Sequence, residues 1–114
     1  MVNTKEKGIL LHIIEHCSRI EETINNVDKK TFDNDKNIKD IVCFNIFQIG
    51  ELAKHFSDEF VSKYPGVPWK NIKGMRDIIG HGYGTIEWDR VWVTATLDIK
   101  PLRVYCQSII DSTK

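Results

Sequence analysis

Three side chains suited to phosphate chemistry lie close together in the segment Arg76–Tyr83. Arg76 carries a guanidinium group, a planar fork that stays charged at ordinary pH and binds phosphate oxygens in pairs. His81 carries the side chain best suited to proton transfer near neutral pH. An arginine and a histidine together can break a phosphodiester bond without a metal ion. We therefore take Arg76 and His81 as candidate catalytic residues, with Tyr83 beside them.

The glycines at positions 80, 82 and 84 decide whether the two candidates can meet. Residues five positions apart on a continuous α-helix point about 140° away from each other. Gly80 or Gly82 can end the helix in a left-handed cap, after which His81 leaves the helical phase and can turn back toward Arg76. The same glycines suggest a phosphate loop, but they lack the G-x-G-x-x-G spacing and a preceding strand. A dinucleotide site of that type is therefore excluded.

Four neighbouring residues have both a functional and a structural interpretation. Lys70 and Lys73 continue the three-residue spacing of Arg76, which describes either a track for phosphates or a solvated helix face. Glu51 either pairs with Arg76 or a neighbouring lysine and orients it, or forms a rim charge at an interface. Trp69 is expected to pack as a core anchor, with base stacking as the alternative.

The spacing of His12, Glu15 and His16 matches the H-x-x-E-H pattern of some zinc enzymes. A catalytic zinc site needs a third protein ligand and a cleft, and no third ligand stands out. Both histidines are also expected to face solvent, opposite the apolar residues of the same helix. Because five-residue patterns occur by chance, we expect neither a metal site nor another cofactor.

The composition is that of one globular domain spanning residues 1–114. Its sixteen basic and sixteen acidic residues cancel, whereas domains that bind nucleic acid tightly and non-specifically are usually basic. A nucleic-acid contact must therefore be local or made by an assembled surface. No apolar run approaches the roughly 20 residues of a membrane span, and the charged N-terminus does not resemble a signal peptide. Three widely spaced cysteines predict free thiols in a reducing cytoplasm.

Helical periodicity runs through nearly the whole sequence, and no segment shows sustained strand alternation. The fold expected is all-α, an up-down four-helix bundle with a kinked C-terminal helix. Pro101 should cause the kink, because proline cannot donate to the carbonyl four residues before it. The polar segment 28–37 is expected to be a loop with a helix start near its end, and a short helix is expected from Ser57 to before Pro65. The main helices are expected at Thr4–Val27, Asn37–Phe56, Pro68–Ile79 and Glu87–Asp111.

The expected helix 37–56 is apolar on two faces. Cys43, Phe44 and Phe47 point to one side, where a surface helix should be polar. Two interpretations remain for this second face. It forms a homodimer interface, which we favour, or the last helix wraps over it. The opposite face consists of Ile38, Ile41, Val42, Ile49, Leu52, Ala53 and Phe56.

The pattern R-x-x-x-x-H-x-Y after residues 68–75 (PWKNIKGM) resembles the HEPN superfamily. It is most similar to the HepT-like branch, toxins that are paired with a minimal nucleotidyltransferase antitoxin. The resemblance extends to residues 47–54, 86–93 and 98–102, and so covers most of the chain in order. It implies an all-α bundle that dimerises.

The resemblance also implies an activity and its residues. A HepT-like protein is a metal-independent endoribonuclease, and the positions of its catalytic residues fall on Arg76 and His81. The residue after the arginine is commonly polar, and Asp77 fits that supporting position. Tyr83 matches the tyrosine that the partner nucleotidyltransferase modifies with AMP; without the resemblance, a tyrosine packed at a helix end is the better interpretation.

A mechanism follows as an expectation. Without a metal to activate water, the nucleophile is the 2′-hydroxyl of an RNA substrate, which DNA lacks. His81 would act as general base or acid, and Arg76 would stabilise charge on the phosphoryl oxygens. A dimer would bring a second His81 to a shared cleft. The alternative is a non-catalytic subunit that binds a nucleotide or the nucleotidyltransferase, with the same two residues as phosphate ligands.

Overall fold

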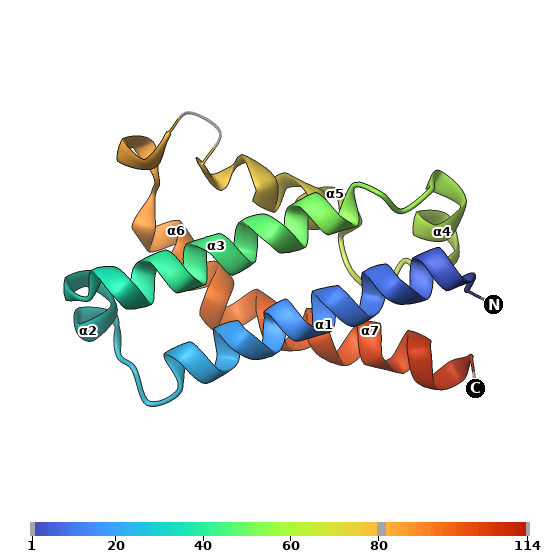
Figure 1. The fold of residues 1–114 in the computed structure, drawn as a ribbon, viewed down its shortest axis with the longest axis horizontal. Helices are drawn as coiled ribbons and strands as arrows, with labels where there is room; N and C mark the ends of the chain where they lie inside the picture. The colour runs from blue at the N-terminus through green and yellow to red at the C-terminus, as the bar shows by residue number, and fades with distance from the viewer. Residues whose placement is uncertain (1, 80–81, 114) are drawn as a thin grey trace.

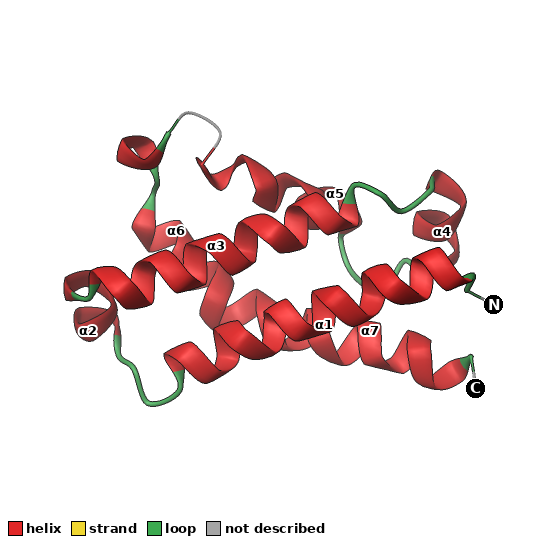
Figure 2. Cartoon of the chain, viewed as in Figure 1, coloured by secondary structure: helices red, strands yellow, loops and turns green. Residues whose placement is uncertain are grey.

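The chain folds as an assembly of helices, as Figures 1 and 2 show. The computed structural model describes residues 2–79 and 82–113, and no strand occurs in that part of the chain. The all-α expectation is confirmed. Three long helices form the frame, and α1 packs against both of the others. They are α1 (Thr4–Ile24), α3 (Lys36–Ala53) and α7 (Ile99–Ser112).

The first helix begins and ends at clear sequence signals. The Asn3 side chain accepts a hydrogen bond from the Glu6 amide at 2.8 Å, and the Glu6 side chain accepts one from the Asn3 amide at 3.0 Å. This capping box satisfies two backbone groups that a helix start leaves free. Asn26 has a φ of 61° and turns the chain just before the expected end at Val27. The buried residues of α1 are Ile9, Leu10, Ile13, Cys17 and Ile20.

The segment expected to be a loop contains a helix of six residues, α2 (Lys29–Asn34). The side chain of Asp28 caps it, and Phe32 is completely buried. The Phe32 ring packs against Trp92, with ring centroids 5.0 Å apart, and against the edge of Trp88 at 6.4 Å. The loop prediction was wrong for 29–34 because a helix with one apolar residue has no periodicity to detect. The helix start expected near the end of the segment is confirmed, since α3 begins at Lys36.

Helix α3 buries most of the expected face, including Val42, Ile49 and Ala53, but its edges differ. Ile41, assigned to the buried side, is 46% exposed, whereas Cys43, assigned to the second side, is buried. Ile46 completes the buried side. Phe44 is 54% exposed, so no described residue of the last helix wraps over it. Ile41 and Phe44 therefore form an exposed apolar patch on α3.

The expected helix 68–79 is two helices in succession. A short α-helix, α5 (Trp69–Gly74), tightens into the 3₁₀-helix η1 (Met75–Ile79). The backbone of η1 lies directly on α3 at Gly50. A Cβ atom on Gly50 would stand 2.2 Å from the Arg76 amide nitrogen and 2.9 Å from the Met75 carbonyl carbon. Only glycine allows this approach, which sets the position of Arg76.

An aromatic cluster holds the start of α5. Helix α4 (Asp58–Lys63) places Phe60 in a stack with Phe56, with centroids 4.0 Å apart. Both rings meet Trp69 edge-on, and the indole N–H of Trp69 donates to the Tyr64 carbonyl at 2.6 Å. Trp69 is 2% exposed. Its expected place as a core anchor is confirmed, because a ring this enclosed cannot stack on a base.

The last helical segment changes direction, as Figure 1 shows between α6 and α7. After the 3₁₀ turn η2 (Tyr83–Thr85), α6 (Trp88–Val93) leads into a π-helical segment, η3 (Thr94–Asp98), and then α7. Pro101 lacks the N–H that would bond to the Leu97 carbonyl in a regular helix. The wider π turn therefore lies where the kink was expected. Within α7, Arg103 Nε donates to Glu21 Oε1 at 2.5 Å and so joins α7 to α1.

Replacing Gly50 by alanine tests the contact between α3 and η1. We expect Gly50→Ala to lower the free energy of unfolding by roughly 1–3 kcal/mol, because the added methyl group forces two backbones apart. The measurement is chemical denaturation followed by circular dichroism. The matched control is Gly8→Ala within α1, where nothing lies within 4 Å of the new Cβ. That variant should gain about 0.5–1 kcal/mol, and equal effects of the two variants would contradict the close approach.

Candidate functional site

Arg76 projects from η1 toward the C-terminal part of α3. Its Nη1 lies 3.7 Å from Glu51 Oε1, and its Nε lies 3.6 Å from Asp77 Oδ1. Both distances exceed those of a hydrogen bond, and the Arg76 side chain is 45% exposed. Glu51 is bound more closely by Lys54, whose Nζ lies 2.7 Å from Oε2. Glu51 therefore orients the guanidinium without occupying its donors.

The other cations of the expected phosphate track do not line up with Arg76. Lys73 is half-buried and makes no ion pair with any described carboxylate. Lys70 lines a cavity between α5 and the segment that leads into the last helix, and neither Lys73 nor Arg76 is among the residues that line it. Asp77, the expected supporting residue, contacts Arg76 alone among the described cations.

Tyr83 is fastened to the opposite part of α3. Its hydroxyl donates a short hydrogen bond to Asp40 Oδ1. Its ring meets the edge of Trp88 at a centroid distance of 5.5 Å, and Lys39 Nζ lies 4.9 Å from the Trp88 ring centroid. The Tyr83 side chain is nevertheless 51% exposed, so a reagent can reach it from solvent.

One face of α3 carries both anchors. Asp40, Phe44, Phe47 and Glu51 follow at spacings of four, three and four residues, which places them in one row along the helix. The row spans about 16 Å, at 1.5 Å per residue. Its first residue binds Tyr83 and its last pairs with Arg76. The segment that joins η1 to η2 contains His81, which lies outside the described residues.

The electrostatics of the two anchors differ. The hydrogen bond to Asp40 raises the pKa of Tyr83 to about 12, so the phenol keeps its proton at neutral pH. The hydrogen bond from Lys54 and the charge of Lys54, followed by the charge of Arg76, lower the pKa of Glu51. Glu51 is therefore an anion under all ordinary conditions, as an orienting partner of Arg76 must be.

Asp40 is the site residue that sequence reasoning missed. A signal for it was present, because Asp40 stands four residues before Phe44 and eleven before Glu51, on the same face of one helix. What the sequence lacked was the fold of residues after position 82, which brings Tyr83 back onto α3.

The histidines of the H-x-x-E-H pattern have separate surroundings. His12 is exposed, whereas His16 is half-buried and its Nδ1 lies 2.7 Å from Asn45 Oδ1. Asn45 Nδ2 donates to the Ile41 carbonyl at 2.8 Å, so Oδ1 is the acceptor and His16 Nδ1 carries the proton. Within 2–79 and 82–113, no three His, Cys, Asp or Glu side chains gather as metal ligands.

Two further expectations concern the whole chain. The three cysteines, Cys17, Cys43 and Cys106, are free and buried. Burial raises the pKa of Cys43 to about 11 and that of Cys106 to about 12, so these thiols stay protonated. None of the helices in the described chain has both the length and the apolarity to cross a membrane.

Comparison with known proteins identifies relatives. The family model described as "Ribonuclease HepT-like" matches residues 13–109. Two proteins of Methanocaldococcus jannaschii that carry provisional RNase names are 30% and 33% identical over 97 and 104 residues, covering 85% and 91% of this chain and 89% and 86% of their own. A protein of Thermococcus cleftensis named "Probable ribonuclease HepT" is 30% identical over 97 residues, 85% of this chain and 88% of its own. No solved structure matches.

The bond between Tyr83 and Asp40 can be measured by titration. We expect Asp40→Asn to move the pKa of Tyr83 from about 12 toward 10, because the charged acceptor that holds the proton is removed. Since the folded-state pKa lies above the unfolded one, the bond stabilises the fold at lower pH, and this contribution is lost as the pH rises through about 12. Ultraviolet absorbance of tyrosinate follows the titration.

The chain contains three tyrosines, so the titration needs an assignment. Tyr83→Phe should remove the transition near pH 12 in the wild-type background and the shifted transition in the Asp40→Asn background. Identical titrations of the wild type and Asp40→Asn would mean that Asp40 does not bind the Tyr83 hydroxyl in solution.

Proposed function

The chain belongs to the HepT-like ribonuclease family, and on that premise we propose that it is a metal-independent endoribonuclease with Arg76 and His81 as its catalytic residues. The observation that carries the proposal is the state of Arg76. The guanidinium is oriented by two carboxylates beyond hydrogen-bond distance and is nearly half exposed. A phosphate can therefore replace these weak contacts with paired, charge-assisted hydrogen bonds.

The proposed reaction is an attack by the RNA 2′-hydroxyl on the adjacent phosphorus. The 2′-oxygen forms a bond to phosphorus, the 5′-oxygen leaves, and the products are a 2′,3′-cyclic phosphate and a 5′-hydroxyl. His81 takes the proton of the 2′-hydroxyl or gives one to the leaving oxygen. Arg76 stabilises the charge that grows on the phosphoryl oxygens. Asp77 and Glu51 keep the guanidinium in place, and Lys73 adds positive charge nearby.

We propose that two chains associate through the apolar patch of Ile41 and Phe44, as HEPN-like four-helix bundles. The patch adjoins the row that begins at Asp40 and ends at Glu51, so a two-fold axis near Phe44 would bring two copies of the motif toward one cleft. The second His81 would then supply the acid when the first acts as the base. Exposed aromatic and aliphatic groups side by side on one helix support this use of the surface.

Tyr83 is the proposed point of control in a toxin–antitoxin pair. A minimal nucleotidyltransferase antitoxin would transfer AMP from ATP to the hydroxyl of this exposed tyrosine, with pyrophosphate as the leaving group. The hydroxyl would lose its proton and, with it, the hydrogen bond to Asp40. The added group brings a negative charge and bulk beside the phosphate site, which repels RNA. The buried, protonated thiols suit a reducing compartment, and we propose that the pair acts in the cytoplasm.

A second candidate function is a non-catalytic subunit that binds a nucleotide or the nucleotidyltransferase. The balance of sixteen basic and sixteen acidic residues favours it, because the chain has no general attraction for RNA. Arg76 and His81 would then be phosphate ligands. An RNA cleavage assay separates the two functions.

We expect the wild-type protein to cleave RNA in the presence of EDTA. Arg76→Ala should lower kcat by roughly 10²–10³-fold, because it removes a donor to the transition state. His81→Ala should lower kcat by roughly 10²–10⁴-fold, because it removes the proton-transfer group. Arg19→Ala, at an exposed ion pair on α1, is the control and should keep full activity. Cleavage that requires a divalent metal, or that survives in His81→Ala, rejects the mechanism.

Phe44→Glu should convert the dimer into monomers, because a carboxylate on the patch cannot be buried without a partner charge. Size-exclusion chromatography with light scattering measures the mass. Val104→Glu places the same charge at a similarly exposed apolar position on α7 and should leave the dimer intact. A Phe44→Glu protein that remains dimeric would move the interface elsewhere.

A further inference from the structure

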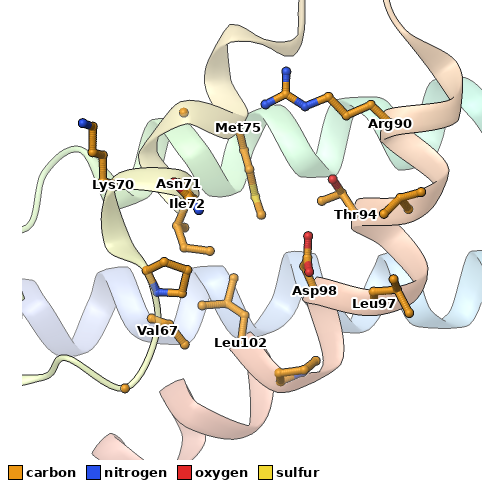
Figure 3. A pocket seen from close by; sticks show the side chains of 15 residues that line it. Val67, Lys70, Asn71, Ile72, Met75, Arg90, Thr94, Leu97, Asp98 and Leu102 are labelled. Carbon is orange, nitrogen blue, oxygen red and sulfur yellow. The ribbon is translucent and has the colours of Figure 1, made fainter.

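A cavity in the described part of the chain lies between the two segments that flank the motif. Its volume is about 670 Å³, within the range of small-molecule sites. One wall comes from α5 and the start of η1, and the other from α6, η3 and the start of α7, as Figure 3 shows. Gly74 and Met75, the residues immediately before Arg76, belong to the first wall.

The cavity has an apolar floor and a polar rim. Ile72 and Leu102 are buried below it, and Met75 points into it (Figure 3). Asp98 also points into the space, beside Thr94. An apolar floor suits the flat face of a nucleobase, and a carboxylate accepts hydrogen bonds from the N–H groups that every base carries.

Two cations border the cavity on opposite sides. Arg90 extends from α6 across the opening, and Lys70 stands on α5 (Figure 3). Neither pairs with a carboxylate among the described residues, in contrast to Arg19, Arg76 and Arg103. Unpaired cations at the edge of an apolar hollow are suited to the phosphates of a bound polyanion.

The cavity continues toward the motif through Arg90. A smaller hollow beside Ile46 and Ile78 is also lined by Arg90, and so is a third next to Asp77 and Thr85. These two hollows reach both 3₁₀ turns, η1 and η2, between which the segment with His81 lies. A nucleotide in the cavity would thus lie beside η1, next to the residue that precedes Arg76. It could belong to the same RNA chain as a phosphate bound by Arg76.

The second wall of the cavity is formed in part by π-helix. Thr94, Leu97 and Asp98 come from the π-helical segment, and Leu97 is 66% exposed. Stretches of π-helix are rare and frequently occur at functional sites. The wide turn displaces these side chains from regular helical positions and so opens the space opposite α5.

We propose that this cavity is a binding subsite for one nucleotide of a single-stranded RNA, next to the nucleotide whose phosphate is cut. The base rests on Met75 and Ile72 with its N–H groups on Asp98, and Arg90 and Lys70 bind the flanking phosphates. The subsite rests on the proposed ribonuclease function and adds the residues that hold the substrate.

The test measures RNA binding in the His81→Ala background, which does not cut the RNA. The double variant Arg90→Gln and Lys70→Gln should bind a fluorescent single-stranded oligonucleotide roughly tenfold more weakly. The slope of log Kd against log salt should also fall by about 0.7 for each phosphate contact removed, which a merely structural role would not cause. The control is Arg19→Gln, with the same loss of charge on α1. Unchanged affinity and slope in the double variant overturn the subsite.

A pair of substitutions at one exposed position identifies the occupant. Leu97→Glu should weaken RNA binding severalfold, whereas Leu97→Lys should keep or strengthen it, because only the sign of the charge differs. Equal weakening by both variants would mean that the effect does not depend on charge, so that no phosphate lies at this edge of the cavity, and would overturn the proposal. Wild-type protein that cleaves RNA while these variants bind normally refutes the subsite alone. Wild-type protein that neither binds nor cleaves RNA refutes the ribonuclease function as well.

Discussion

The contact between the backbones of α3 and η1 determines where Arg76 lies. Gly50 has no side chain, so the Arg76 amide approaches α3 to a distance that any Cβ would forbid. This approach puts the guanidinium beside Glu51, one residue further along α3. The catalytic proposal therefore depends on the missing Cβ atom of Gly50, although α3 contains no residue of the motif Arg76–Tyr83.

The row of residues on α3 sets the separation between Tyr83 and Arg76. Tyr83 is bound near one end of its row and Arg76 near the other, with Phe44 between them. The two ends are bound differently. Tyr83 makes a short, charge-assisted hydrogen bond, whereas Arg76 has contacts that water and phosphate can displace. The strong hydrogen bond of Tyr83 fits its proposed role as the point of control. The weak contacts of Arg76 fit its proposed role as a ligand for the substrate.

The sequence predicted most of the helices because long amphipathic helices repeat their pattern often enough to be recognised. Helix α1 carries five buried residues in one stripe, and α7 carries a similar stripe. Phe32 belongs to a helix that is too short to show a repeat. The burial of Cys43 and Ile46 depends on tertiary packing against α3. Arg76, Glu51 and Tyr83 were found as residue types, but the bond of Tyr83 to Asp40 joins positions 43 residues apart. Such a bond follows from tertiary packing, which local spacing does not encode.

The π-helical segment has a consequence for the phase of the last helix. Val91, Ala95 and Ile99 are buried at two successive intervals of four residues, and a regular α-helix would rotate the third about 80° away from the first. The wider turn absorbs that rotation, so α6 and α7 bury one continuous stripe while running in different directions. The last helical segment thus consists of two parts, α6 and α7, and the π-helical turn between them adjusts the rotation of one relative to the other. The part before the π-helical turn can contact Phe32 of α2 without altering the register in which α7 packs on α1.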